Sequence, residues 1–363
     1  MTSQLSFEVR PNPQARSTAE RERVLEAPGF GQTFTDHMVS IDFTEGEGWH
    51  DARLEPYGPL VLDPATSVFH YAQELFEGLK AYRQANGSIV AFRPFANAAR
   101  FNASAARMAM PELPEDVFVE SLELLVQTDR EWVPTTEGHS LYLRPFMIAT
   151  QAGLGVNYPS KTYRYMVIAS PAASYFAGGV KPVSVWLSTE YTRAAPGGTG
   201  FAKCGGNYAA AFVAQRQAVA EGCDQVVWLD AVEHRYVEEM GGMNLFFVFG
   251  DRLLTPALTG TLLPGITRDS ILTFAADLGL TAEEGRLSIE EWQAGCESGE
   301  LTEVFACGTA AVVTPVGSVK GADRAWTVGD GTPGPVTLKI REELMGIQYG
   351  TRPDPHTWVH KIA

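Results

Sequence analysis

The chain has 363 residues, which exceeds the size that one hydrophobic core usually supports, so we expect two domains. Its content of 45% hydrophobic and 20% charged residues is that of a globular protein with a large core. A net charge of −15, without a cluster of Lys and Arg, argues against nucleic acid or an anionic membrane surface as a partner.

The spacing of cysteines and histidines excludes the common metal motifs. Cys204, Cys223, Cys296 and Cys307 form no C-x-x-C pair, and the seven histidines show no H-E-x-x-H pattern. We therefore expect reduced thiols and no metal site. The N-terminus lacks a basic start followed by an apolar stretch, and no run approaches the ~18 apolar residues of a membrane span. These features predict a cytoplasmic protein without a membrane segment.

The first half of the chain predicts an α+β domain, residues 1–170. Residues 1–28 contain Pro11, Pro13 and a charged stretch, so we expect a loosely held arm there. Proline suits the first turn of a helix, and Pro94 therefore predicts a helix start. The predicted elements are a strand at Ile89–Phe92, helices from Pro94 to about Met108 and from about Glu115 to Arg130, and strands at 140–149 and 163–169.

The second half predicts another domain, residues 182–363, after a linker at residues 171–181. The linker contains small residues, a proline and two glycines between strand-like runs. The elements expected beyond it are strands near 183–188, 225–229 and 244–249, and helices near 208–221, 268–279 and 335–346. In the first of these helices we expect Phe212, Val213 and Ala220 to be buried, with Gln215 and Arg216 on the opposite face.

One lysine, Lys203, lies in a glycine-rich run, Thr199–Tyr208. Tight backbone surroundings of this kind can exclude water from the amine and free its lone pair to attack a carbonyl. A nucleotide-binding P-loop is excluded, because it needs Gly before the lysine and Ser or Thr after it, where this chain has Ala202 and Cys204. A lone lysine is more often an exposed residue beside a turn, so other motifs must decide the interpretation.

Four such motifs accompany Lys203 in a fixed order: Phe76–Ala81, Glu239–Leu245, Leu263–Arg268 and Phe305–Ala310. With them, the chain resembles the branched-chain amino-acid aminotransferases, pyridoxal-phosphate (PLP) enzymes of the fold-type IV group, from about Phe30 to Tyr349. The resemblance implies two α+β domains of the D-amino-acid aminotransferase-like architecture, with the cofactor at the domain interface. It also implies that Lys203 belongs to a large C-terminal domain and that the protein is a homodimer.

The resemblance assigns Lys203 the Schiff base with PLP and implies further contacts to the cofactor. Ile266 and Thr267 open a helix, where N–H groups can bind an anion, although by themselves they fit an ordinary helix start better. The family's phosphate arginine falls at Arg100, and its carboxylate at the pyridine nitrogen falls at Glu239, whereas the neighbouring Glu238 is expected to face solvent. The remaining matches are Tyr208 at the phenolic oxygen, Thr309 at the phosphate and Arg193 near the phosphate pocket.

The same resemblance implies a substrate pocket with aromatic walls. Its residues are Tyr71, Phe76, Tyr142, Arg144, Phe30, Leu154, Val156 and Ala310. Arg144 lies two residues along a strand from Tyr142, on the same face, and can reach the distal carboxylate of glutamate. The loop with Leu154 and Val156 is implied to close the pocket of the neighbouring subunit. One methylene changes binding in an apolar pocket by only ~1–3 kcal/mol, so we expect leucine, isoleucine and valine all to be accepted.

The reaction implied is a ping-pong transfer of the amino group of L-leucine, L-isoleucine or L-valine to 2-oxoglutarate, giving branched-chain 2-oxo acids and L-glutamate. Two alternatives keep the fold, a D-amino-acid aminotransferase and an aminodeoxychorismate lyase, and a third is a binding protein without chemistry. Some members of the family carry a C-x-x-C redox pair where this chain has Ala311–Thr314, so thiol regulation is not expected there. Cys204 stays a candidate for oxidation.

Overall fold

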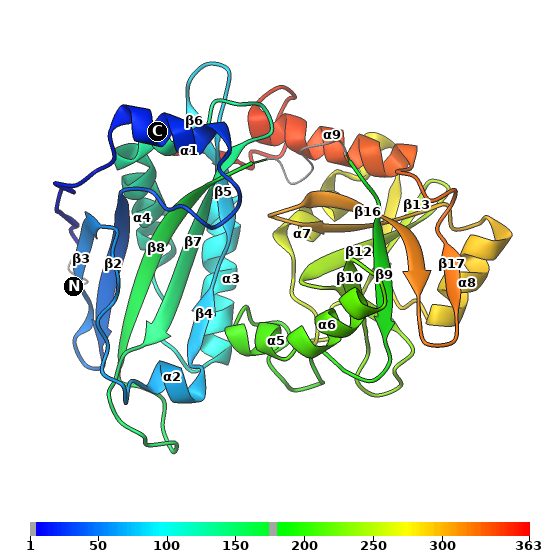
Figure 1. The fold of residues 1–363 in the computed structure, drawn as a ribbon, viewed down its shortest axis with the longest axis horizontal. Coiled ribbons are helices and arrows are strands. Elements are labelled where there is room, and N and C mark those ends of the chain that lie inside the picture. The colour runs from blue at the N-terminus through cyan, green and yellow to red at the C-terminus, as the bar shows by residue number, and fades with distance from the viewer. Residues whose placement is uncertain (1–4, 174–179) are drawn as a thin grey trace. The chain divides into compact units, whose positions relative to one another are not determined.

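The computed structural model describes residues 5–173 and 180–363, which form two compact units (Figure 1). The first unit takes the described residues within Met1–Ser174, Ala202–Gly205 and Gly346–Ala363, and the second those within Tyr175–Phe201 and Gly206–Met345. Lys203 and the end of the chain therefore group with the first unit, whereas the sequence placed both in the C-terminal domain. Residues 174–179 of the predicted linker lie outside the described residues.

The first unit is built on a sheet of nine strands, counted over its described residues. Their order is β1-β3-β2-β8-β7-β5-β6-β18, with β4 attached to β7. The strands are β1 (Glu8–Val9), β2 (His37–Thr44), β3 (Gly48–Pro56), β4 (Glu74–Phe76), β5 (Leu79–Arg83), β6 (Ile89–Phe92), β7 (Ser140–Ala149), β8 (Thr162–Ala172) and β18 (Val359–Lys361). Along β7, buried side chains alternate with partly exposed ones, as expected of a strand with one face in the core.

Two helices, α3 (Pro94–Arg107) and α4 (Glu115–Thr128), cover one face of this sheet (Figure 1). Their buried side chains, among them Phe101 and Phe118, share one hydrophobic core with the strands. The predicted helix start at Pro94 is confirmed, and the predicted helix near 115–130 ends at Thr128. The other helical segments of the unit are α1 (Thr18–Glu26), α2 (Ser67–Tyr71) and the 3-10 helix η1 (Arg130–Trp132).

The N-terminal arm is held more firmly than its composition predicts. β1 pairs in parallel with β3, and α1 begins with a capping box between Ser17 and Glu20. The N–H of Asn12 donates to Nε2 of His37 in β2, at 3.0 Å. Residues 1–4 lie outside the described residues. The arm from residue 5 onward is thus tied to the sheet by backbone and side-chain hydrogen bonds.

The second unit is also built on a sheet of nine strands, counted over its described residues. Their order is β11-β10-β9-β16-β15-β12-β13-β14, with β17 attached to β16. The strands are β9 (Val183–Ser188), β10 (Gln225–Leu229), β11 (Val237–Met240), β12 (Met243–Phe249), β13 (Arg252–Pro256), β14 (Thr281–Gly285), β15 (Glu303–Gly308), β16 (Val312–Lys320) and β17 (Ala325–Thr327). Because β11 pairs with β12 as well as β10, the strands from β11 through β12 close into a ring.

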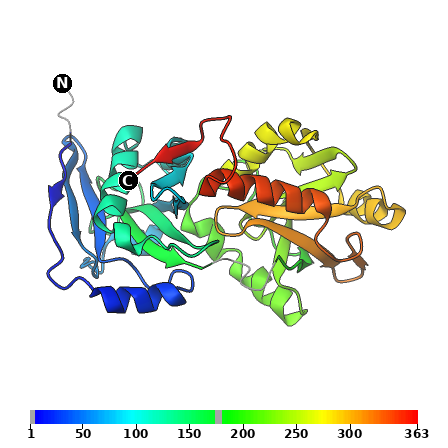
Figure 2. The same ribbon diagram turned by 90° about the horizontal axis from the view of Figure 1, so that it is seen from above.

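The helical segments beyond Lys203 can be followed in Figure 2, which shows the ribbon from a second direction. They are α5 (Gly205–Ala209), α6 (Phe212–Ala220), α7 (Ile266–Phe274), the 3-10 helix η2 (Ala276–Leu278), α8 (Ile289–Ser298) and α9 (Pro335–Tyr349). Within the part of the chain that the structure describes, no helix combines the length and apolar character needed to cross a membrane.

The helix predicted near 208–221 is divided into α5 and α6, and its predicted buried face is wrong. Phe212 and Val213 are 65% and 47% exposed. The buried residues are instead Ala214 and Ala218, which lie four residues apart and pack in the same cluster as Trp186 and Trp228 of the sheet. The sheet's large indole rings leave room for the small alanine side chains, so the larger apolar residues of α6 face outward.

Candidate functional site

Lys203 is held by its backbone within the first unit. Its N–H donates to Oγ of Ser104 in α3, at 3.0 Å, and its carbonyl accepts from the N–H of Phe76 at the end of β4, at 3.0 Å. The N–H of Gly205 donates to the carboxylate of Glu74, and a Cβ at Gly205 would collide with that carboxylate. Hydrogen bonds from α3 and β4 thus fix the loop that carries the amine. The sequence alone does not predict the roles of Ser104 and Glu74.

Arg100, the predicted phosphate ligand, forms a buried ion pair with Glu77. Its Nε and Nη2 donate to the two carboxylate oxygens of Glu77 at 2.7 and 2.8 Å, and the two side chains are 9% and 0% exposed. Glu77 itself is anchored by its N–H, which donates to the carbonyl of Pro145 at 2.7 Å. The carboxylate therefore fixes the orientation of the guanidinium. Glu77 was not among the predicted site residues, although a charged residue inside the apolar motif Phe76–Ala81 signals a buried partner.

Four predicted substrate residues come together in the first unit. The rings of Phe30 and Tyr142 meet edge to face, with centroids 5.0 Å apart. Nη2 of Arg144 donates to Oη of Tyr142 at 2.9 Å, and its guanidinium carbon lies 4.6 Å from the ring centroid of Phe76. Nζ of Lys203 lies 5.0 Å from the same Phe76 ring. The amine is therefore next to aromatic walls and a guanidinium group.

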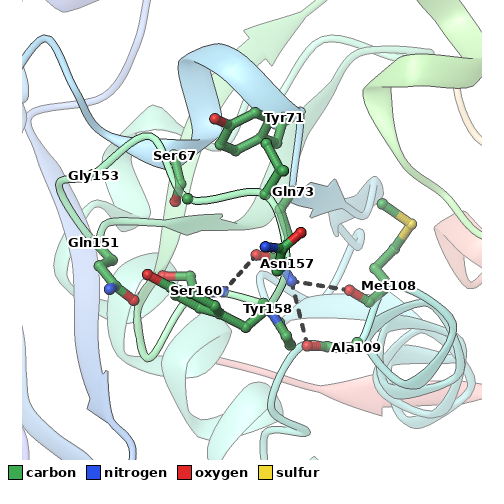
Figure 3. Close-up of a pocket in the computed structure, with 13 residues that line it drawn as sticks. Ser67, Tyr71, Gln73, Met108, Ala109, Gln151, Gly153, Asn157, Tyr158 and Ser160 are labelled. Atoms are coloured by element: carbon green, nitrogen blue, oxygen red, sulfur yellow. Dashed lines mark hydrogen bonds between the residues drawn. The ribbon is translucent and has the colours of Figure 1, made fainter.

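Tyr71 and Val156 lie apart from that cluster, at a cavity of about 400 Å³ (Figure 3). Oη of Tyr71 donates to the carbonyl of Leu154 at 2.6 Å, and the side chains of Leu154 and Val156 are 64% and 70% exposed. Gln73 connects this loop to α3, because it accepts from the N–H of Ser160 and donates to the carbonyl of Met108. Lys203 is not one of the described residues that line this cavity.

Glu239 is the centre of the predicted group in the second unit. Its side chain is 2% exposed, and Oε2 accepts from Nε of Arg193 at 2.6 Å. Oε1 accepts from the N–H of Leu263 at 2.8 Å and from Nδ2 of Asn244 at 3.3 Å. A guanidinium and two further donors stabilise the negative charge of this buried carboxylate. Arg193, predicted near the phosphate, contacts the carboxylate that is predicted to bind the pyridine nitrogen.

The neighbouring Glu238 was expected to face solvent, and this expectation is wrong. Its side chain is only 7% exposed and accepts a hydrogen bond from the hydroxyl of Thr261. Burial raises the pKa of Glu238, and the Thr261 hydrogen bond opposes that shift. Glu238 lies in β11, a strand that is paired with β10 and with β12 and whose four residues are all buried, and not in a surface turn.

The start of α7 has the features of an anion site. Ile266 and Thr267 are its first residues, and among the described residues no side chain caps this end. A Cβ at Gly265, just before the helix, would overlap Oδ1 of Asn244. Asn244 therefore contacts both Glu239 and the start of α7, which brings these two parts of the predicted cofactor site together within the second unit.

The other predicted residues of the second unit lie in a turn and in a short helix. Thr309 and Ala310 are half-buried in the turn between β15 and β16. Tyr208, in α5, lies close to Gly242, where an added Cβ would be 3.5 Å from Cε1 of the tyrosine. Gly242 follows β11, the strand that carries Glu239. Of these residues, the structure connects Tyr208 most directly to the Glu239 group.

The four cysteines are free thiols, and three of them, including Cys204, are buried. Cys204 is 2% exposed, which shields the thiol beside Lys203 from oxidants. Burial raises the pKa of Cys296 to about 11, and it also raises the pKa of Cys307. Within residues 5–173 and 180–363, no group of three or more His, Cys, Asp or Glu side chains could hold a metal ion.

The chain has the fold and motifs of a class IV aminotransferase, because the sequence model of the amino-transferase class IV family matches residues 74–319. The branched-chain-amino-acid aminotransferase of Mycolicibacterium smegmatis is 61% identical to it, over 99% of this chain and 98% of the relative. The protein of that name from Mycobacterium tuberculosis is 59% identical over the full length of both chains. This chain therefore belongs to the branched-chain-amino-acid aminotransferase family.

Solved structures support the same family. The branched-chain amino acid aminotransferase of Escherichia coli covers 90% of this chain and 100% of its own, with 29% identity and a TM-score of 0.74. The T.th. enzyme of the same name, solved with pyridoxamine 5'-phosphate, covers 90% of this chain and 99% of its own, with 30% identity and a TM-score of 0.72. The two-domain architecture of helices and strands predicted from the sequence is confirmed.

PLP is the cofactor of this family, and the side chains of this protein fit its chemical groups. Lys203 offers an amine for the aldehyde, beside the Phe76 ring. Glu239 offers a buried anion for the pyridine nitrogen, and the start of α7 offers N–H groups for the phosphate. The missing Cβ at Gly265 leaves room for Oδ1 of Asn244 against the backbone in front of α7. Each unit therefore offers groups that suit part of the cofactor.

Proposed function

We propose that this protein transfers the amino group of L-leucine, L-isoleucine or L-valine to 2-oxoglutarate, and back, with PLP as its cofactor. The observation that carries this proposal is 59–61% identity over nearly the whole chain to aminotransferases named for that substrate class. When bound, PLP supplies the aldehyde that accepts the amino group and the ring that takes up the electron pair released at the substrate Cα. The protein supplies proton transfer, orientation and selectivity.

Lys203 is proposed to move the proton. Its Nζ takes the proton from the substrate Cα as a general base and returns it in the reverse direction as a general acid. The bonds of its backbone to Ser104 and Phe76 restrict where the amine can reach. A base held in this way saves the entropy of bringing the two reacting groups together.

Glu239 is proposed to keep the pyridine nitrogen protonated. Arg193, Asn244 and the N–H of Leu263 hold its carboxylate in a single orientation and stabilise its charge. A fixed anion at that position favours the positive nitrogen, which in turn favours electron uptake by the ring. Arg100, oriented by Glu77, is proposed to contact the phosphate with the start of α7.

Both substrates are proposed to use the cluster of Phe76, Tyr142 and Arg144. The ring faces contact an aliphatic side chain, and the guanidinium receives the distal carboxylate of glutamate or 2-oxoglutarate. Nε of Arg144 is buried and has no hydrogen-bond acceptor among the described residues, so this donor suits an incoming carboxylate. Phe30 supports Tyr142 from the side through its edge-to-face contact.

We also propose a homodimer and a cytoplasmic location. The free cysteines fit a reducing compartment. The strongly exposed apolar side chains of Leu154 and Val156 fit contact with a second copy of the chain. Sedimentation of the purified protein at several concentrations tests the dimer, since a species with the mass of one chain throughout the range would contradict it.

The deciding experiment is the visible absorption spectrum of the purified protein before and after addition of L-leucine or D-alanine. The yellow band of the lysine-bound cofactor should fade with L-leucine and persist with D-alanine. A response to D-alanine alone would favour a D-amino-acid aminotransferase, and a yellow protein that ignores both would favour a lyase. A colourless protein that takes up no added PLP would contradict the whole proposal.

A substitution series accompanies that spectrum. Lys203→Ala should abolish amino transfer from L-leucine to 2-oxoglutarate, because no other base is assigned to the substrate Cα. The matched control is Lys161→Ala, which removes an exposed lysine paired with Glu45 and should leave turnover unchanged. Turnover at the wild-type rate in Lys203→Ala would overturn the assignment of this lysine.

A further inference from the structure

The second unit contains a cavity of about 330 Å³ that the transamination site described above does not use. Its walls come from the turn after β10, from β11, from the loop after β13 and from the end of β14. Most of them are apolar, among them Val232, Pro256 and Leu262. The volume falls in the range of small-molecule sites, roughly 300–1,000 Å³.

One of the residues that line this cavity is a buried acid, Glu238. Glu238 is only 7% exposed, and its Oε1 accepts a hydrogen bond from the hydroxyl of Thr261. Among the described residues, Oε2 receives no hydrogen bond and Glu238 forms no ion pair. A carboxylate in a residue that is only 7% exposed is poorly hydrated, so a positively charged hydrogen-bond donor in the cavity would stabilise it.

The charged groups at the mouth of the cavity are already engaged. The guanidinium carbon of Arg286 lies 3.5 Å from the ring centroid of Tyr236, and its Nη2 donates to Glu233 at 3.2 Å. The carboxylate of Asp230 accepts from four backbone N–H groups of the turn after β10. Together with Glu238, these groups give the cavity an excess of negative charge. Arg286 therefore does not satisfy Glu238 in the present arrangement.

We propose that this cavity binds a small organic ammonium ion with an aliphatic body, anchored by an N–H donor to Oε2 of Glu238. The body contacts the apolar walls formed by Val232 and Leu262 and is removed from water. Pairing satisfies the buried charge and the open hydrogen-bond site together. A divalent metal ion fits less well, because Ca²⁺ and Mg²⁺ need about six oxygen ligands and the walls are mainly apolar.

The proposal is tested by isothermal titration of the PLP-loaded protein with N,N-dimethylbutylamine, which is protonated at neutral pH. A tertiary amine has one N–H donor when protonated and cannot condense with the cofactor's aldehyde. We expect one site per chain. We also expect at least tenfold weaker binding to Glu238→Gln, which keeps the shape and the Thr261 hydrogen bond, and at least tenfold weaker binding of uncharged N,N-dimethylbutanamide to the wild type.

Two further variants make the result independent of how well Glu238→Gln folds. Val232→Trp, at a side chain that is 74% exposed, narrows the mouth without touching the core and should abolish binding. Glu300→Gln removes an exposed acid outside the cavity and should leave the affinity unchanged. Saturating L-leucine should also leave it unchanged.

Three results would overturn the proposal. One is that the wild type does not bind the amine at millimolar concentration. Another is that the amine binds equally to the wild type, Glu238→Gln and Val232→Trp, or no better than the amide. The third is that L-leucine displaces the amine, which would locate it in the transamination site.

Discussion

The buried carboxylates Glu77 and Glu239 differ in the groups that donate hydrogen bonds to them. Glu77 uses both oxygens for one guanidinium, that of Arg100. Glu239 divides its oxygens among Arg193, Asn244 and a backbone N–H. Removal of one member of such a pair costs more than the pair contributes, because the remaining charge stays buried without compensation.

Glu77→Gln should therefore destabilise the protein strongly. The amide cannot neutralise the Arg100 guanidinium, and we expect the free energy of unfolding to fall by about 3 kcal/mol. Urea denaturation monitored by fluorescence measures the change. The matched control, Glu131→Gln, removes an exposed partner of Arg130 and should change stability little. Equal stability of the two variants would show that the buried pair does not hold this region.

Asp230 provides a pH-dependent contribution at the turn between β10 and β11. Burial alone would raise the pKa of Asp230, but backbone N–H donors, led by that of Tyr236, lower it to about 2. The pKa is thus lower in the folded chain than in the unfolded one. Such a group stabilises the fold fully above about pH 4, and its contribution is lost as the pH falls toward about 2.

Asp230→Asn should lower the free energy of unfolding at pH 7 by about 1–2 kcal/mol, a figure discounted for the partial exposure of the side chain. The difference from the wild type should shrink as the pH falls from 5 to 3. Urea denaturation at a series of pH values checks both statements. Asp251→Asn, at an exposed position, serves as the control. A difference that stays constant between pH 7 and pH 3 would exclude the proposed linkage.

Secondary structure was predictable wherever the local pattern carried the information. The strands at Ile89–Phe92 and Val183–Ser188 agree with their predicted ranges, because apolar runs end at clear turns. β11 was missed, since two glutamates inside a strand of four residues resemble a surface turn. The face of α6 was mispredicted for a different reason: helical spacing selects the large apolar residues, whereas the sheet offers room only for alanines.

The buried face of α6 can be tested by comparing the stability of two variants, one at an exposed position and one at a buried position. Phe212→Ser should leave the free energy of unfolding nearly unchanged, since the ring is 65% exposed. Ala218→Leu should lower it by about 1–3 kcal/mol, because the added carbons must fit against a fully packed core. Thermal unfolding of both variants makes the comparison. A larger loss for Phe212→Ser than for Ala218→Leu would restore the face predicted from the sequence.

The sequence predicted the candidate site residues that lie within motifs, but it did not predict the residues that hold them in place. Lys203, Glu239 and Thr267 stand in recognisable motifs, but the partners that hold them come from distant positions. Ser104 is 99 residues from Lys203 in the sequence, and Glu77 is 23 residues from Arg100. The same limit applies to the division into units, because the return of residues 346–363 to the first unit depends on pairing across most of the chain.

The last prediction concerns the C-terminal segment, residues 346–363, which belongs to the first unit. β18 pairs with β6, Ile362 is 3% exposed, and Nε2 of Gln127 in α4 donates to the carbonyl of Ile362 at 2.8 Å. A chain that ends at Pro353 would leave the backbone of β6 unpaired at the sheet edge and would open the core beneath Ile362. The loss should fall on the first unit, since no residue of β18 belongs to the second.

Hydrogen–deuterium exchange with mass spectrometry can locate this loss. In the shortened chain, exchange should rise at least tenfold in β6 and in the helices α3 and α4, which share the core with Ile362. Peptides from β12 and β15 should exchange at the wild-type rate. Lys361→Ala, which changes only an exposed side chain of β18, should leave both units unchanged. If exchange rose equally in both units, the C-terminal segment would stabilise the molecule as one cooperative body, and the grouping of residues 346–363 with the first unit would have no energetic meaning.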